Sequence, residues 1–323
     1  MSSFRRRLMM MQGSGSGIIP SDKAVVGDVC MYDTANDKLV IANDWDSLKY
    51  PIDIYIPVGV VVIPGSHGHY ADGKCAIMSL NNMKYDTPTT GGAGQTMMWG
   101  VYGTDIESLP NLDQVPYIGS SGSVGDIVIG QTTYGYLPSD HSSFTAVTNP
   151  YDEGTNYFYN TEYCIASPYM NDGSFNPNYS LTDSPSSDLN CLADFDGYNN
   201  TKKILEVRGS KDYSSWLPTN VQEDYPAASC CDMYSTVGIP QGSWYLPSAG
   251  ELGYTVPRRQ ALDDCLTKLK NAGLSQVSNL VSSHYWSSSE FSSGRARLVY
   301  LNDGVVINDS KDSTSYVRAF AMV

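Results

Sequence analysis

The spacing of apolar residues predicts two helices in the C-terminal part of the chain. Between Ala261 and Leu269 apolar residues recur at helical spacing, and Gly273 is a natural end for this helix. Upstream, Ser248 and Glu251 have the spacing of a capping box, in which each side chain satisfies a backbone N–H at a helix start. We therefore expect one helix beginning after Ser248 and a longer one ending near Gly273.

After Tyr285 the pattern changes to that of strands. Residues 297–301 and 305–308 flank Asn302-Asp303-Gly304, a strong signal for a two-residue β-hairpin. A last strand is expected over residues 315–322. Two helices followed by antiparallel strands predict an α+β unit.

The first part of the chain shows strand patterns instead. Turn residues and prolines separate short apolar or alternating runs. The predicted strands are residues 27–32, 37–42, 52–56, 58–63 and 75–80. The fold class we predict is therefore mixed: an N-terminal all-β domain, residues 18–145, followed by an α+β domain, residues 146–323.

Composition narrows the range of partners. The net charge is −14, only 17% of residues are charged, and no basic patch lies outside the N-terminus, which argues against a nucleic-acid partner. The 24 tyrosines suit recognition surfaces, because a tyrosine joins a large apolar face to a polar tip. The alternative is that most of them lie half-buried on strands.

Residues 1–17 form a basic, Met-rich arm that ends in a Gly/Ser tether. The apolar run has four residues, short of the roughly 7–15 of a signal peptide, and no segment elsewhere reaches transmembrane length. We expect a chain made in the cytosol, without membrane insertion, whose flexible arm orders on a partner; a disordered tail is the alternative. The residues predicted to dock are Arg5, Arg6, Arg7, Met9 and Met10.

The cysteines and histidines give little support for a metal or a catalytic centre. Seven cysteines without a Cys-x-x-Cys pair indicate buried free thiols rather than a zinc site or a complete disulfide framework. His67 and His69 could ligate a metal on a threefold axis, and Asp194-Phe-Asp-Gly197 loosely resembles the start of a calcium loop. A polar turn and an Asx-rich turn are the simpler interpretations, so we predict no metal and no cofactor.

Catalysis is likewise not expected. The nucleophile elbow, the phosphate-binding glycine loop and the His-Glu-x-x-His zinc motif are all missing from the sequence. A glycosidase with paired carboxylates stays open as a remote alternative, because a sequence does not give the separation of acidic groups in space. We predict that the protein is not an enzyme.

Several ordered motifs carry a resemblance to a known family. They are Asp194-Phe-Asp-Gly197, Asn200-Thr201, Tyr225-Pro-Ala-Ala228 with Cys230, Trp244-Tyr-Leu-Pro-Ser248, Glu251-Leu252, Tyr285-Trp-Ser-Ser-Ser-Glu290 and Tyr316-Val-Arg-Ala-Phe320. Residues 190–323 resemble the Fibrobacter succinogenes major paralogous domain and the related Lcl C-terminal domain. The resemblance implies a C-type-lectin-like fold for the second domain and a binding or display module without a defined active site.

The resemblance also implies roles for individual residues. Arg318 is expected to pair with a carboxylate such as Glu290, because buried charges need partners. The residues expected to form the framework are Trp244, Pro247, Glu251, Trp286, Glu290 and Arg318. From fold analogy and composition, the residues expected to bind a ligand are Tyr198, Tyr213, Trp216, Phe291 and Arg295.

A second resemblance concerns the first domain. Residues 55–64, followed by the Met-Ser-Leu strand at 78–80, are similar to attachment domains of virion proteins from Bacteroides-infecting, crAss-like phages. This implies a structural virion protein, a head or tail fibre or decoration, that docks on capsid, portal or tail proteins. It would be made in the host cytoplasm, form a homo-oligomer such as a trimer, and adhere to a host surface glycan or protein. The alternatives are a glycan-binding adhesin of the bacterial cell surface and, remotely, a glycan-cleaving enzyme.

Overall fold

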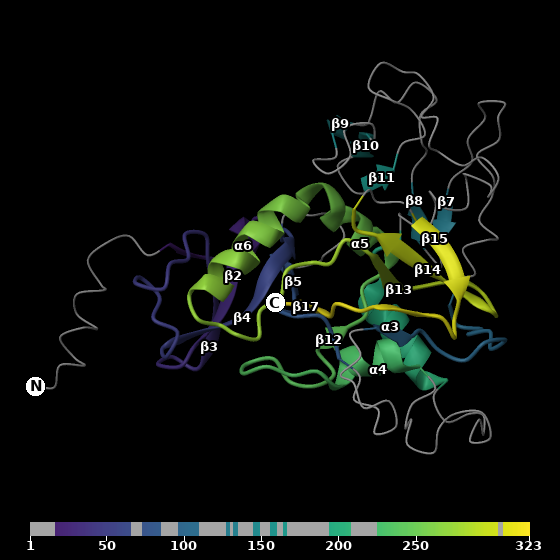
Figure 1. The fold of residues 1–323 in the computed structure, drawn as a ribbon, viewed down its shortest axis with the longest axis horizontal. Helices are drawn as coiled ribbons and strands as arrows, with labels where there is room; N and C mark the ends of the chain where they lie inside the picture. Colours follow the sequence, from purple (N-terminus) through teal and green to yellow (C-terminus); the bar gives the residue numbers. More distant parts are fainter. Residues whose placement is uncertain are drawn as a thin grey trace, which may run out of the picture.

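The computed structural model of the chain describes residues 17–65, 73–84, 96–109, 194–207, 225–302 and 306–323, together with five short strands between residues 127 and 166 (Figure 1). The α-helices in these ranges are α3 (Gly197–Glu206), α4 (Pro226–Met233), α5 (Ala249–Thr255) and α6 (Arg259–Asn271). The 3-10 helices are η1 (Ser21–Lys23) and η3 (Val256–Arg258). None of the helices described is long and apolar enough to cross a membrane.

Seven of the described strands form the larger sheet, in which every neighbouring pair is antiparallel. Its order is β1 (Ile18–Ile19), β3 (Lys38–Ala42), β2 (Val29–Asp33), β4 (Tyr55–Ile63), β5 (Ala76–Met78), β17 (Phe320–Met322) and β12 (Trp244–Tyr245). The predicted hairpin of β2 and β3 is confirmed, and Asp33 stabilises its turn by accepting hydrogen bonds from the backbone N–H groups of Ala35 and Asn36.

The second sheet joins five strands of the described ranges. Its order is β15 (Val306–Ser310), β14 (Arg295–Tyr300), β13 (His284–Ser292), β16 (Thr314–Tyr316) and β6 (Thr96–Met98). Strands β14 and β15 pair antiparallel on either side of the predicted hairpin turn, of which residues 303–305 lie outside the described residues. The short strands between residues 127 and 166 form a pair and a triplet: β7 (Ile127–Ile129) with β8 (Thr132–Tyr134), and β9 (Thr145–Thr148), β10 (Asn156–Tyr159) and β11 (Cys164–Ala166).

Both large sheets combine strands from the two segments that the sequence analysis treats as separate domains. In the first sheet β5 pairs with β17, with Ile77 opposite Ala321. In the second, β6 pairs with β16, with Met97 opposite Ser315. The described strands of residues 18–145 and 146–323 therefore share hydrogen-bonded ladders, which local patterns in the sequence do not reveal. The mixed, β-rich fold class is confirmed.

Two sequence predictions differ from the structure in an informative way. The strand expected over 315–322 is divided into β16 and β17, which belong to different sheets, and the connection between them carries the buried Arg318. The strand expected over 52–56 begins only at Tyr55, because residues 51–54 form a turn in which the Ile54 N–H donates to the Pro51 carbonyl.

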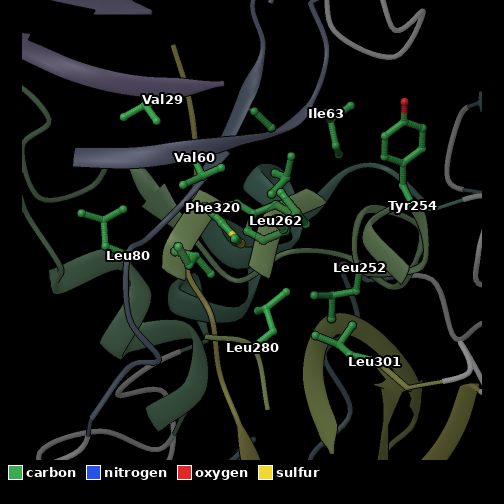
Figure 2. Packing of buried hydrophobic residues seen from close by; sticks show 14 of the residues in the cluster. Val29, Val60, Ile63, Leu80, Leu252, Tyr254, Leu262, Leu280, Leu301 and Phe320 are labelled. Atoms are coloured by element: carbon green, nitrogen blue, oxygen red, sulfur yellow. The ribbon is translucent and has the colours of Figure 1, made fainter. Parts of the chain in front are cut away.

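The larger sheet is covered by apolar side chains on both faces. Along β4, Val60 and Val62 belong to one hydrophobic cluster and Val58 and Val61 to another, so this strand is buried on both sides. The first cluster includes the predicted apolar face of α6, which lies across β2, β4 and β5 (Figure 1). Figure 2 shows part of this cluster, to which α6 contributes Leu262, β17 contributes Phe320 and β4 contributes Val60.

The second cluster contains three of the chain's tryptophans. Trp99, Trp244 and Trp286 are at most 1% exposed and pack there with residues of α4. Indole N–H groups tie the cluster to the backbone: Trp99 donates to the Ser287 carbonyl at 2.7 Å and Trp286 to the Met97 carbonyl at 2.8 Å. Burying a side chain of this kind is worth roughly 1.5–3 kcal/mol or more, so the second cluster fixes β6 and the loop after it against β13.

Candidate binding surface and its buried framework

The motif Asp194-Phe-Asp-Gly197 places a carboxylate at the centre of a buried hydrogen-bond network. The Asp194 side chain accepts from the Asp196 N–H at 3.0 Å, from the Asn200 amide at 2.9 Å and from the Ser289 hydroxyl at 2.5 Å. The first of these contacts is an Asx turn. Burial raises the pKa of Asp194, and the Ser289 and Asp196 hydrogen bonds oppose that rise. This carboxylate therefore joins the start of α3 to β13.

The predicted capping box at the start of α5 is confirmed. The Ser248 hydroxyl accepts from the Glu251 N–H, and the Glu251 carboxylate accepts from the Ser248 N–H at 2.7 Å. Glu251 is 1% exposed and also accepts from the Tyr245 hydroxyl at 3.0 Å. The Ser248 hydroxyl lies 2.5 Å from the Asp194 carbonyl oxygen, to which it donates, so the capping box and the Asp194 network are one unit.

The first residue of α3, Gly197, packs directly against this unit. A Cβ atom at this position would lie 2.1 Å from a Glu251 carboxylate oxygen and 2.7 Å from the Ser248 nitrogen. The requirement for glycine here arises from close approach rather than from an unusual backbone angle. The start of α3 and the capping box of α5 are thus two segments, distant in the sequence, that meet at one point.

Glu290 pairs with Lys311, not with Arg318 as the sequence analysis expects. Both side chains of the pair are fully buried. Burial raises the pKa of Glu290 to about 7 and lowers the pKa of Lys311. The pairing could not be foreseen, because Lys311 stands outside the motifs and follows a strand that carries no special pattern.

Arg318 is held mainly by neutral oxygens. Its guanidinium donates to the Ser79 carbonyl at 2.8 Å, to the Ser278 carbonyl at 3.1 and 3.2 Å, and to the Asn82 side-chain oxygen at 3.1 Å. Burial lowers its pKa to about 10. The residue therefore fastens the crossing between β16 and β17 to two distant loops, and the other predicted framework residues, Trp244, Pro247 and Trp286, are buried as well.

Two of the predicted ligand-binding residues lie at the turn between β13 and β14. Arg295 is exposed and donates to the Asn308 side chain at 2.8 Å, while half-buried Phe291 packs beneath the Arg297 guanidinium, whose carbon lies 4.4 Å from the ring centre. A second aromatic residue, Tyr102, packs close to Gly294, where an added Cβ would lie 2.9 Å from its ring. We call this group, Tyr102, Phe291, Gly294, Arg295 and Asn308, the turn surface.

Tyr102 was not foreseen by the sequence analysis. It is 64% exposed, which is high for a large aromatic side chain, and it stands far from the turn in the sequence. Exposed aromatic residues next to oriented polar groups are typical of recognition surfaces. Since Gly294 leaves the room that the ring occupies, the close contact depends on a glycine at the tip of the β13–β14 turn.

The remaining predicted ligand-binding residues lie elsewhere or outside the described residues. Tyr198, on α3, is half-buried and packs edge-on against Tyr245 with ring centres 5.9 Å apart. The positions outside the described residues are Tyr213, Trp216, Arg5, Arg6, Arg7, Met9 and Met10, and also His67 and His69. Their roles stay predictions.

The described ranges offer little support for a metal site or for a reactive thiol. No three His, Cys, Asp or Glu side chains among the described residues are grouped so that they could hold a metal ion. Cys30, Cys75, Cys231 and Cys265 are free thiols, and burial raises the thiol pKa of Cys75 and of Cys265 to about 12. These thiols are therefore poor nucleophiles at neutral pH.

Comparison with known proteins adds one neighbour. No family model matches the chain, and no curated protein matches it. Among solved structures, a fimbrial protein from Bacteroides ovatus ATCC 8483 is similar, with a TM-score of 0.43 and 16% sequence identity. The match covers 92% of this chain and 48% of that protein, so the chain spans about half of its length.

Proposed function

We propose that this chain is a structural adhesion component, which presents the turn surface on a rigid framework and carries out no catalytic step. The observation that carries the proposal is the burial of the motif carboxylates. Asp194, Glu251 and Glu290 are at most 2% exposed and are engaged in internal hydrogen bonds. A glycosidase requires two carboxylates that face its substrate, and these three face the interior instead.

The turn surface has the chemistry of a glycan-binding site. The exposed ring of Tyr102 offers an apolar face on which a sugar ring can stack. Arg295, oriented by Asn308, offers N–H donors to hydroxyl oxygens. Each contact of this kind is weak, so adhesion by this surface depends on many copies acting together.

The assembly that we propose to display these copies is a virion. Support comes from the resemblance of residues 55–64 and 78–80 to attachment domains of phage virion proteins, and from the basic arm at residues 1–17. In this proposal the arm docks on capsid, portal or tail proteins, the chain forms a homo-oligomer such as a trimer, and the lectin-like region faces the host. The alternative is display on a bacterial cell surface, and fractionation distinguishes the two.

Fractionation tests the assembly, and a binding measurement tests the surface. Recovery of the chain in fixed ratio with capsid or tail proteins in purified particles is expected; recovery with a bacterial envelope fraction would show that the assembly is cellular. For adhesion, the full chain and a Tyr102→Ala, Arg295→Ala double variant are applied to a glycan array. Binding that is lost in the double variant is expected.

The matched control is Leu48→Ala, which removes an apolar side chain that is 91% exposed in the connection between β3 and β4. This control is expected to bind as the wild type does. Binding that survives in the double variant would exclude the turn surface as the site. A wild-type chain that binds no glycan on the array would contradict glycan adhesion itself.

A further inference from the structure

The buried contact between Glu290 and Lys311 brings an amine and a carboxyl group together where water is excluded. Glu290 lies on β13, and Lys311 directly follows β15, on the far side of β14. Both side chains have no exposed surface, and the Lys311 ammonium contacts a Glu290 carboxylate oxygen. Neither group takes part in the turn surface.

The loop after β6 encloses the two groups and supplies polar contacts to each. The Thr104 carbonyl accepts from the Lys311 amine at 2.6 Å, and the Ile106 N–H lies 3.4 Å from both Glu290 carboxylate oxygens. The Trp99 ring covers the amine, with its centre 4.8 Å from Nζ. One group is thus aimed at the other, while a backbone N–H points at the carboxyl oxygens.

We propose that Lys311 and Glu290 condense to an amide, an isopeptide bond that crosslinks β13 to the segment following β15. The neutral Lys311 amine attacks the carboxyl carbon of protonated Glu290, and a C–N bond forms. The C–O bond to the carboxyl hydroxyl breaks, and that hydroxyl leaves as water with one proton from the nitrogen. No atom is oxidised or reduced, and no co-reactant is consumed. The Ile106 N–H is placed to stabilise the negative charge that develops on the carboxyl oxygen.

The environment favours the neutral forms that this reaction needs. Burial raises the pKa of Glu290 to about 7 and lowers the pKa of Lys311, so transfer of the proton from the amine to the carboxylate is less costly than in water. A buried ion pair is poorly solvated, whereas an amide carries no net charge, which favours the product. The charge of exposed Asp105 raises the pKa of both groups, which favours the protonated form of Glu290 but opposes the neutral form of Lys311.

A second amine–carboxylate contact in the chain provides an internal comparison. Lys202 and Asp232 lie 2.6 Å apart, but their side chains are 33% and 25% exposed. Water solvates this pair, which favours its charged form. The inference therefore predicts a crosslink at Lys311 and none at Lys202.

Mass spectrometry of the full chain, purified and then denatured, tests the crosslink. The expected intact mass is lower than the sequence mass by one water molecule. Digestion is expected to yield a branched peptide in which Lys311 is joined to Glu290. An intact mass equal to the sequence mass would overturn the proposal. So would a loss of water mapped to an Asp-Gly step such as Asp196-Gly197, because those steps can lose water by cyclising.

Two variants assign the bond without depending on the stability of the folded chain. Lys311→Met and Glu290→Met are each expected to show their full sequence mass, and Lys202→Met is expected to keep the loss of one water. Methionine replaces Glu290 because a glutamine could itself react with the amine and release ammonia. Loss of water that persists in Lys311→Met would assign the modification elsewhere and overturn the proposal. The outcome does not depend on whether the chain is an adhesion component.

Discussion

Replacement of Gly197 by alanine is the sharpest test of the buried framework. In most helices this change is favourable by roughly 1 kcal/mol, because alanine has the higher helix propensity. At this position the added methyl group would lie 2.1 Å from the Glu251 carboxylate and 2.7 Å from the Ser248 nitrogen. We therefore expect the opposite sign.

The size of the effect follows from the contacts that must yield. Moving the Glu251 carboxylate breaks its 2.7 Å hydrogen bond with the Ser248 N–H, and a hydrogen bond to a charged group contributes about 1.5–3 kcal/mol. Crowding against the Ser248 backbone adds about 1–3 kcal/mol, as overpacked cores generally do. After the propensity gain is subtracted, Gly197→Ala should lower the free energy of unfolding by about 1.5–5 kcal/mol.

Urea unfolding followed by tryptophan fluorescence measures this quantity. Gly273→Ala is the control: nothing lies within 4 Å of a Cβ there, but its φ of 99° disfavours alanine, so it should cost only about 1 kcal/mol. In a Glu251→Ala background the penalty at Gly197 should shrink by at least about 1 kcal/mol, because one of the two crowded partners is gone. A Gly197→Ala variant as stable as the wild type would refute the reasoning.

Three further changes probe other parts of the structure. Lys311→Met should lower the free energy of unfolding more at pH 8 than at pH 5. The pKa of Glu290 is about 7 with the amine present, and without the amine this buried carboxylate must bind a proton for the chain to fold, so the stability that Glu290 contributes falls as the pH rises above 4.5, its pKa in the unfolded chain. Equal losses in urea titrations at the two pH values would contradict this. Leu266→Ala, in the apolar face of α6, should cost roughly 2–5 kcal/mol in the same assay, and a loss below about 1 kcal/mol would show that the site collapses around the cavity. Arg318→Met should lower the free energy of unfolding by about 3 kcal/mol or more, because the Ser79 and Ser278 carbonyls lose their donors. A thermal unfolding midpoint close to that of the wild type would contradict the role of Arg318 in holding the β16–β17 connection.

Local signals in the sequence predicted the elements that depend on neighbours in the chain. The capping box of Ser248 and Glu251 and the apolar face of α6 were predicted correctly, because their physical causes lie within a few residues. The β2–β3 hairpin belongs to the same group, since its turn is stabilised by Asp33 from inside the turn.

The features that escaped prediction depend on partners far away. Nothing in the sequence near Ser315 shows that the chain changes sheets after Tyr316, since both halves of the segment are suited to strands. The same reason hid the contact of Tyr102 with Gly294. Similarly, Glu290 needed a cation, but only the packing of β13, β14 and β15 selects Lys311 over Arg318.

The position of β17 in the larger sheet also constrains the order of folding. This strand lies between β5 and β12, so the ladder of β5 is completed only after nearly the whole described chain has been synthesised. Until then the edge of β5 that faces β17 exposes unpaired N–H and C=O groups, together with apolar residues such as Ile77 that are buried in the folded chain. Contacts between such distant residues form slowly. Products truncated before residue 320 should therefore fold poorly and aggregate, whereas changes confined to the exposed turn surface should leave the yield of folded protein unaltered.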